Sequence, residues 1–450
     1  MDIALIVLDT ARGDITNSLI AEEKLTNIAT LAQQGRWYTD ARANGPWTVP
    51  SHGSIFTGNY PSESGINGAS PSYESVPLIE ELSSQGFKTA GFSANPWLSP
   101  EFGFADSFNN FCTKFDIYGE GASMASLLRD DGSPQERLTK LFDELNQHSL
   151  MNSVSNIIFW AYQNQFRKDT GGKHLLSQAQ KWVSNTKGDT FSFINLTEPH
   201  LPYSFPQKWL PNLVNHKQLK NIPQNTAEYN AAEVSISQEE FRILRNAYKG
   251  ALKYVDHIIG EFIESTSDDT VFIILGDHGE HFGEYDRFGH QYSLYRELLH
   301  VPLVISGPGI ETTQIQKPVE LRSLYNFILS LSNGSINELK TSNYPIAETV
   351  SPQPSIETLK EKTEESPHQF TLQYAEGARC IAGEEGKVVE FPDGSSEVIE
   401  VGSDTVSVSD FQNRLLSRLN DECGAMKWAP SNEIDVSEAT KSQLEDLGYA

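Results

Sequence analysis

Cysteine is scarce in this chain, which has only three cysteines in 450 residues. Their odd number and wide spacing exclude a disulfide framework and a Cys-x-x-Cys metal site. Long apolar runs are also missing. The run Ile3–Leu8 near the N-terminus is too short for a membrane span or for the core of a signal peptide. We therefore expect a cytoplasmic protein with no membrane partner.

Basic residues are few as well. Lys and Arg number 34 against 60 Asp and Glu, so the net charge is −26. A surface of this sign repels nucleic acid and anionic lipid, so neither is expected as a partner. An anionic substrate would need local positive charge, from a metal ion or from a few basic side chains. The oligomeric state stays open at this point.

Five short apolar runs read as strands that are buried on both faces, as in a parallel sheet. Amphipathic helical stretches lie between them, and the clearest is Gln238–Glu264. Alternating strands and helices predict an α/β fold with a mostly parallel central sheet and helices on both faces. The expected strands are Ile3–Leu8, Lys88–Ser93, Phe191–Leu196, Val271–Leu275 and Pro302–Ser306.

Composition divides the chain into a large α/β domain over residues 1–345, a Pro- and Glu-rich linker or loop over 346–368, and a smaller α+β unit over 369–450. In that unit, Phe370–Val401 alternates like antiparallel strands with turns at 383–386 and 393–394, and Asp410–Leu419 is expected to be helical. Gly119–Pro134 reads as a surface insertion.

Two expected strands end in residues that can bind a cation. Asp9 follows the first strand, and Arg12 lies three residues later. Asp277 and His278 follow the strand Val271–Leu275. Ligands of open α/β sheets bind beyond the carboxyl ends of the strands, and carboxylates with an imidazole suit a divalent metal. The alternatives are an Asp helix cap with a surface Arg, and an Asp cap beside an ordinary buried His.

A third motif, Pro46–Gly53, is a Pro-punctuated turn that precedes a helical segment. It presents Thr48 at a helix N-terminus, where free N–H groups favour an anion. A metal bound to the Thr48 oxygen would lower the pKa of the hydroxyl and make it a nucleophile. Taken alone, the motif fits a Ser or Thr that caps a helix better than it fits a nucleophile.

Together the three motifs resemble the sulfatase branch of the alkaline phosphatase superfamily. The resemblance rests on Asp9–Arg12, Trp47–Gly53 and Gly276–Glu280, in this order, and covers most of residues 1–310. It implies an alkaline phosphatase-like sandwich. Similar segments are also present at Phe56–Gly65, Glu198–Tyr203, Tyr248–Gly260, His290–Leu303 and Leu444–Tyr449.

The resemblance implies a metal-dependent ester hydrolase with a Thr nucleophile. His200 would contact the substrate anion or protonate the leaving group, and His290 would bind a substrate oxygen. Arg12 and His52 would support the nucleophile loop. The implied ligands of one divalent metal are two carboxylates, an imidazole and the nucleophile itself: Asp9, Asp277, His278 and Thr48.

The chain departs from the family pattern at four positions. Thr48 replaces the Cys or Ser that sulfatases convert to formylglycine, and His52 replaces an Arg. Thr10 replaces an Asp ligand and His278 an Asn, which moves the expected metal from Ca²⁺ towards Mn²⁺, Zn²⁺ or Mg²⁺. These departures favour a small phosphodiester, phosphate or phosphonate monoester as substrate. A sulfuric ester hydrolase, a phospho-group transferase and a non-catalytic binding protein on this scaffold are the alternatives.

Overall fold

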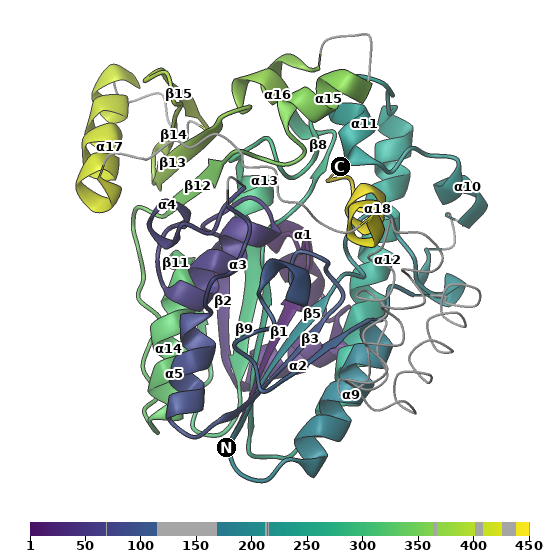
Figure 1. Ribbon diagram of the computed structural model, residues 1–450, viewed down its shortest axis with the longest axis vertical. Coiled ribbons are helices and arrows are strands. Elements are labelled where there is room, and N and C mark those ends of the chain that lie inside the picture. Colours follow the sequence, from purple (N-terminus) through teal and green to yellow (C-terminus); the bar gives the residue numbers. More distant parts are fainter. Residues whose placement is uncertain are drawn as a thin grey trace, which may run out of the picture.

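The computed structural model describes residues 1–68, 70–114, 169–211, 214, 216–362, 367–400, 408–424 and 438–449. The expected insertion at Gly119–Pro134 lies outside these residues. Figure 1 shows a large central sheet covered by helices on both faces, with a smaller sheet beyond its upper end. The predicted α/β fold class is confirmed.

The central sheet is mostly parallel, and β1 lies in its middle between β5 and β6. Strand β9 runs antiparallel to its neighbours β2 and β6, and β11 pairs with β2. All five expected strands are present. The strand order is β10 (Thr313–Ile315), β2 (Arg36–Arg42), β9 (His300–Ser306), β6 (Thr270–Gly276), β1 (Asp2–Leu8), β5 (Thr190–Leu196), β3 (Lys88–Ser93) and β4 (Asn110–Thr113), with β11 (Val319–Glu320) off this path.

Side-chain alternation along β1 explains why the sheet is covered on both sides. Ala4, Ile6 and Leu8 enter one hydrophobic core, whereas Ile3, Leu5 and Val7 enter the other. The first core is formed with α1 (Gly13–Ala21), α2 (Thr26–Gln34), α9 (Gly172–Asn185) and α12 (Gln238–Ile263). The second is formed with α3 (Thr48–Thr57), α5 (Pro77–Ser84) and α14 (Leu324–Ser332).

The smaller sheet is antiparallel, in the order β12 (Ile346–Val350), β13 (Gly377–Gly383), β14 (Gly386–Glu390) and β15 (Ser396–Ile399). Helix α17 (Val408–Cys423) packs against it and contains the segment Asp410–Leu419, which was expected to be helical. Both expected turns, at 383–386 and 393–394, join its strands.

Two expectations for this region are wrong. Residues 346–368 are not simply a linker, because they begin with the buried strand β12 and include α15 (Ile356–Lys362). The segment expected as strand from Phe370 begins instead inside the helix α16 (Gln369–Gln373). The domain boundaries themselves stay a prediction.

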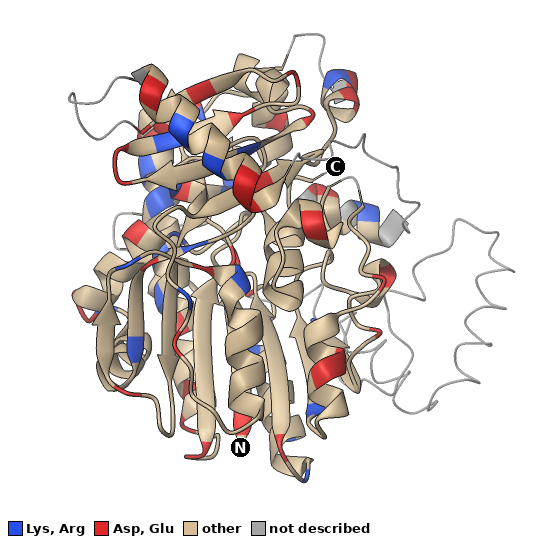
Figure 2. Cartoon of the chain, turned by 90° about the vertical axis from the view of Figure 1, so that its left-hand side faces the viewer, with Lys and Arg blue, Asp and Glu red and all other residues tan. Residues whose placement is uncertain are grey.

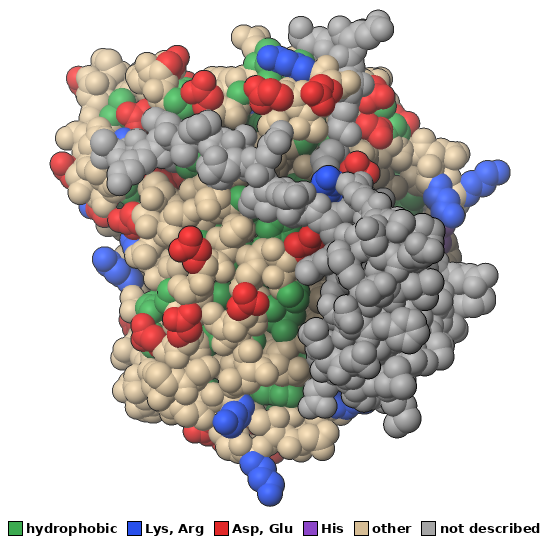
Figure 3. Space-filling view, in the orientation of Figure 1, with side chains coloured by type: hydrophobic (Ala, Val, Ile, Leu, Met, Phe, Trp, Pro, Cys, Tyr) green, Lys and Arg blue, Asp and Glu red, His purple; other side chains and the backbone are tan. Residues whose placement is uncertain are grey.

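Short elements complete the described chain, and none of its helices is both long enough and apolar enough to cross a membrane. Figure 2 shows few charged residues on the strands in the middle of the central sheet, and Figure 3 shows acidic side chains scattered over the described part of one face. The short elements are α4 (Pro61–Ser64), α10 (His216–Lys220), α11 (Thr226–Asn230), α13 (Arg296–Leu299), α18 (Glu438–Asp446), β7 (His281–Phe282) and β8 (Phe288–Gly289).

Candidate active site

The candidate metal ligands meet at the carboxyl ends of two neighbouring strands. Leu8 of β1 pairs with Gly276 of β6, so the next residues, Asp9 and Asp277, lie side by side. His278 Nε2 lies 3.6 Å from Asp9 Oδ1 and 3.4 Å from Asp277 Oδ2. The three ligand atoms lie within 4.8 Å of one another, and all three side chains are buried. Residues 268 positions apart along the chain therefore form one cluster.

The cluster presents three buried polar atoms that lack a hydrogen-bond partner: Asp9 Oδ1, Asp277 Oδ2 and His278 Nε2. The other atoms are engaged. Asp277 Oδ1 accepts from the backbone N–H groups of Thr10 and His278, at 3.2 and 3.0 Å. His278 Nδ1 lies 3.0 Å from the Gly279 carbonyl, to which it donates, so the lone pair of Nε2 faces the carboxylates. Unpartnered buried acceptors are costly, and this set of donors fits a divalent cation.

Burial also perturbs the protonation of the cluster. Burial, followed by the charge of Asp9, raises the pKa of Asp277 well above its usual range. Burial, followed by nearby His290, lowers the pKa of His278 well below its usual range. In the absence of a metal, both shifts disfavour the charged forms of these side chains, and a bound cation would favour the ionised carboxylate.

Thr48 is linked to this cluster through an asparagine. Trp47 has an extended backbone, and helix α3 begins at Thr48. Thr48 therefore lies in the first turn of this helix. Asn95 Nδ2 donates to Asp9 Oδ2 at 2.7 Å and to Thr48 Oγ1 at 3.1 Å. Ser51 Oγ donates to the Asp277 carbonyl at 2.6 Å, which ties α3 to the end of β6.

His52 lies one helical turn after Thr48 and contacts the backbone of that turn. Its Nδ1 donates to the Thr48 carbonyl at 2.9 Å and lies 3.6 Å from Asp277 Oδ2. Its ring packs against Phe56 and Phe193. Burial lowers the pKa of His52 to about 4, so the ring is neutral near pH 7.

Arg12 occupies a different place from the one implied. Its guanidinium donates to both carboxylate oxygens of Asp14 and to Glu284, and also to the Glu280 carbonyl at 3.0 Å. It thus braces the loop after His278. The nucleophile turn is held instead by Asn95, His52 and Ser51.

Two further histidines face the cluster. The His290 ring lies 4.5 Å from the His278 ring and 5.2 Å from the His200 ring, measured between centroids. His200 Nε2 has no hydrogen-bond partner and is buried. His281 Nε2 lies 3.0 Å from Ser293 Oγ, and this histidine is not part of the described metal cluster.

Two residues that the structure brings to Thr48, Asn95 and Tyr449, were not predicted from the sequence. Asn95 follows β3, so the strand-end rule used for Asp9 and Asp277 also applies to it. Tyr449 comes from the C-terminal segment, and its hydroxyl lies 3.4 Å from Thr48 Oγ1 and 2.8 Å from His290 Nε2. Its position depends on how the C-terminal helix docks, which no local pattern reveals.

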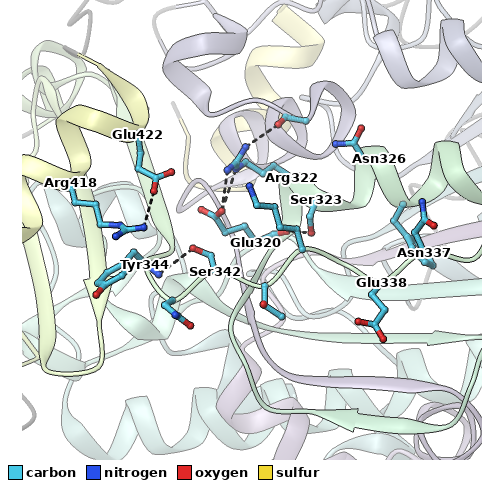
Figure 4. A pocket seen from close by; sticks show the side chains of 15 residues that line it. Glu320, Arg322, Ser323, Asn326, Asn337, Glu338, Ser342, Tyr344, Arg418 and Glu422 are labelled. Carbon is cyan, nitrogen blue, oxygen red and sulfur yellow. Dashed lines mark hydrogen bonds and ion pairs between the residues drawn. The ribbon is translucent and has the colours of Figure 1, made fainter.

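A separate cavity of about 560 Å³ lies beside α17 and α14 (Figure 4). Its two arginines are paired: Arg322 lies 3.3 Å from Glu320, and Arg418 lies 3.2 Å from Glu422. Neither Thr48 nor any of the clustered ligands lines it. The buried cluster, with its unpartnered atoms, is therefore the better candidate for the reaction centre.

The structure gathers a hydroxyl, two carboxylates and several imidazoles at the carboxyl ends of the central strands, so one site combines a potential nucleophile with ligands for a metal. Comparison with known proteins identifies the family. The profile of the sulfatase family matches residues 2–335, and the chain belongs to that family. It is an ester-bond hydrolase of the alkaline phosphatase and sulfatase superfamily, as the motifs predicted.

Its relatives include both sulfatases and phosphonate hydrolases. The chain is 24% identical over 439 residues to a sulfatase of Formosa agariphila, covering 88% of this chain and 81% of that protein. It is 23% identical to a choline-sulfatase of Rhizobium meliloti, covering 80% and 72%. Among solved structures, a phosphonate monoester hydrolase from Silicibacter pomeroyi superposes with a TM-score of 0.63 at 17% identity, covering 94% of each chain.

Proposed function

We propose that this sulfatase-family enzyme hydrolyses small phosphodiesters or phosphate or phosphonate monoesters, with Thr48 as its nucleophile. The observation that carries the proposal is the position of Thr48 Oγ1, which shares the Asn95 amide with Asp9 beside three unpartnered ligand atoms. A hydroxyl at a helix N-terminus, next to a cation site, has the surroundings that a nucleophile for anionic esters requires.

Asp9, Asp277 and His278 would hold one divalent metal beside Thr48, with Mn²⁺, Zn²⁺ or Mg²⁺ favoured by the mixed oxygen and nitrogen ligands. A cation there would offset the negative charge that develops on the substrate oxygens. Asn95 orients the Thr48 hydroxyl, and His52 holds the turn that carries it. His200 and His290 stand on the facing side, where either ring can contact the departing group.

The residue at position 48 supports phosphorus over sulfur as the reacting centre. Formylglycine, which sulfatases form from Cys or Ser, releases sulfate by elimination, and Thr does not give that group. A threonyl ester of either acid must be cleaved by water. Solved structures of similar fold include phosphonate monoester hydrolases and sulfatases, so the fold is compatible with either reacting centre.

A sulfuric ester hydrolase is the second candidate, because the relatives most similar in sequence include a sulfatase and a choline-sulfatase. It would share the fold, the metal site and the nucleophile and would differ in the bond cleaved. Aryl phosphodiester, aryl phosphonate, aryl phosphate and aryl sulfate substrates, assayed against Mn²⁺, Zn²⁺, Mg²⁺ and Ca²⁺, separate the two. Faster turnover of the sulfate would overturn the first proposal.

Thr48→Ala tests the nucleophile. We expect kcat to fall by about 10³-fold or more, because no other group takes over bond formation. Thr57→Ala is a matched control: Thr57 ends the same helix, and its hydroxyl donates to the Gly53 carbonyl at 2.7 Å. Near wild-type turnover in Thr48→Ala would refute the assignment.

A further inference from the structure

The C-terminal helix ends in a motif that projects one aromatic side chain. The N–H of Gly448 donates to the Glu445 carbonyl at 2.9 Å, and the N–H of Tyr449 donates to the Leu444 carbonyl at 2.8 Å. This is the Schellman arrangement, with a glycine of positive φ, +81°, just after the helix. Tyr449 and Leu444 also share a hydrophobic cluster, the contact that usually accompanies this motif.

Tertiary contacts dock this helix end near the reaction centre. The Gly448 carbonyl accepts from Thr226 Oγ1 at 3.4 Å, and a Cβ at position 448 would lie only 2.4 Å from that oxygen. Figure 1 places α18 and the C-terminus close to α11, towards the upper end of the sheet. The last described residue therefore reaches the edge where the parallel strands end.

Rings surround Tyr449, so that its hydroxyl has one defined position. Its side chain is only 3% exposed. The ring centroid lies 5.9 Å from that of Trp47, 5.6 Å from Trp97, 5.5 Å from His290 and 6.0 Å from His200. A phenol packed on several sides loses little freedom when it makes a hydrogen bond.

Hydrogen-bond donors around His290 set the direction of its bond to Tyr449. The Gln291 side-chain oxygen accepts from the His290 backbone N–H at 3.4 Å, which leaves the Gln291 amide N–H to donate to His290 Nε2 at 3.2 Å. His290 Nε2 is therefore an acceptor, and the Tyr449 O–H donates to it at 2.8 Å. His290 Nδ1 faces the Glu280 carboxyl at 3.2 Å.

The bond between Thr48 and Tyr449 has a direction as well. Asn95 Nδ2 donates to Thr48 Oγ1, so the hydroxyl hydrogen of Thr48 is left for another acceptor. The Tyr449 oxygen, at 3.4 Å, has a lone pair free because its own hydrogen points to His290. The chain of donors thus runs from Thr48 through Tyr449 to His290.

We propose that Tyr449 is a further catalytic residue, a hydroxyl that carries the proton of Thr48 to His290 as Thr48 attacks. The inference rests on the proposed function of Thr48. In this step the Thr48 oxygen bonds to phosphorus and the bond from phosphorus to the ester oxygen breaks. The Thr48 proton passes to the Tyr449 oxygen, and the phenol proton passes to His290 Nε2. His290 then returns a proton to the ester oxygen, which leaves as an alcohol.

Tyr449→Phe keeps the ring and removes only the hydroxyl. In the full chain with its best metal, we expect kcat on the preferred aryl ester to fall by about 10²-fold while KM changes by less than about threefold, because proton transfer is lost and substrate binding is kept. His290→Ala should lose a similar amount. The double variant should be no slower than the slower single variant, since residues of one relay act as a unit.

Tyr325→Phe is the matched control, because its hydroxyl bonds to Glu81, away from the site. It should keep wild-type kcat. Thermal unfolding with and without Mn²⁺ checks that the Tyr449→Phe protein is folded and still responds to metal.

Three results would overturn the relay: unchanged kcat in Tyr449→Phe, losses that multiply in the double variant, or faster turnover with a lower KM. The last result would mean that the phenol occupies the place of the substrate. Thr48→Ala separates this inference from the proposed function. If that variant keeps turnover, both fall; if it is inactive while Tyr449→Phe is unchanged, only the relay falls.

Discussion

Replacing Asp277 by Asn should make the metal-free protein more stable and abolish its response to metal. Asp9 and Asp277 are fully buried, and their ligand atoms lie within 4.8 Å of each other. Two negative charges at that separation repel by about 3.5 kcal/mol at an effective dielectric constant of about 20. Burial and Asp9 raise the pKa of Asp277, so proton uptake relieves part of this repulsion.

The size of the effect is measurable as a shift in Tm. A chain of 450 residues has an unfolding entropy of roughly 0.9 kcal/mol/K, so 3.5 kcal/mol corresponds to a rise of up to about 4 °C for the metal-free variant. For the wild type, metal at 100 times its Kd stabilises the fold by about 2.7 kcal/mol, or about 3 °C. Asp277→Asn should lose that second shift.

Calorimetry of protein dialysed against EDTA, with and without added Mn²⁺, measures both effects. Asp256→Asn is the matched control, since the Asp256 carboxylate is also buried but accepts from the N–H groups of Ile28 and Asn27. That variant should be destabilised and should keep the metal response. A less stable Asp277→Asn protein that still gains Tm with metal would refute both the repulsion and the ligand assignment.

Two further substitutions test other parts of the molecule. Asn95→Ala should lower kcat by about 10- to 100-fold, because the amide orients Thr48 and pairs with Asp9; unchanged kcat on the same aryl ester would contradict this role. Burial and then neighbouring arginines lower the pKa of His300 to about 4, below its usual 6.5. The unfolded chain therefore binds the proton more tightly than the folded protein, and stability falls as the pH drops from 6.5 towards 4. His300→Gln should therefore reduce the loss of stability between pH 7 and 4.5 by up to about 2.5 kcal/mol relative to the wild type. Urea unfolding measures this loss, and equal losses in both proteins would exclude His300 as a cause.

The central sheet could be predicted because most of its strands can be recognised from their own short stretch of sequence. β1, β5 and β6 are buried on both faces and are therefore nearly continuous apolar runs. β2 (Arg36–Arg42) was missed, since it carries Arg, Thr and Asp and is only partly buried near the edge of the sheet. β12 was missed because its Ala, Glu and Thr residues are buried by a sheet whose other strands lie later in the chain.

The metal cluster could be predicted for the same reason, from the residues that directly follow these strands. Asp9 and Asp277 each follow an apolar strand, and parallel neighbours bring such positions together without any further information. Asn95 satisfies this rule after β3 and could have been named. Arg12 could not be placed, because its position is decided by Asp14 and Glu284, which belong to a helix and a loop on either side of it.

The position of Tyr449 could not be predicted from the local sequence. The sequence Leu444–Tyr449 encodes a helix end, since glycine at a positive φ is what the Schellman motif requires. It does not encode which surface that helix covers, because the contact with Thr48 closes a separation of 401 residues through packing against Trp47 and Trp97. Ligands at strand ends are fixed by backbone register, whereas the groups opposite them depend on how separate elements dock. Proton-transfer partners of this site are therefore the residues for which the three-dimensional structure adds most to the sequence.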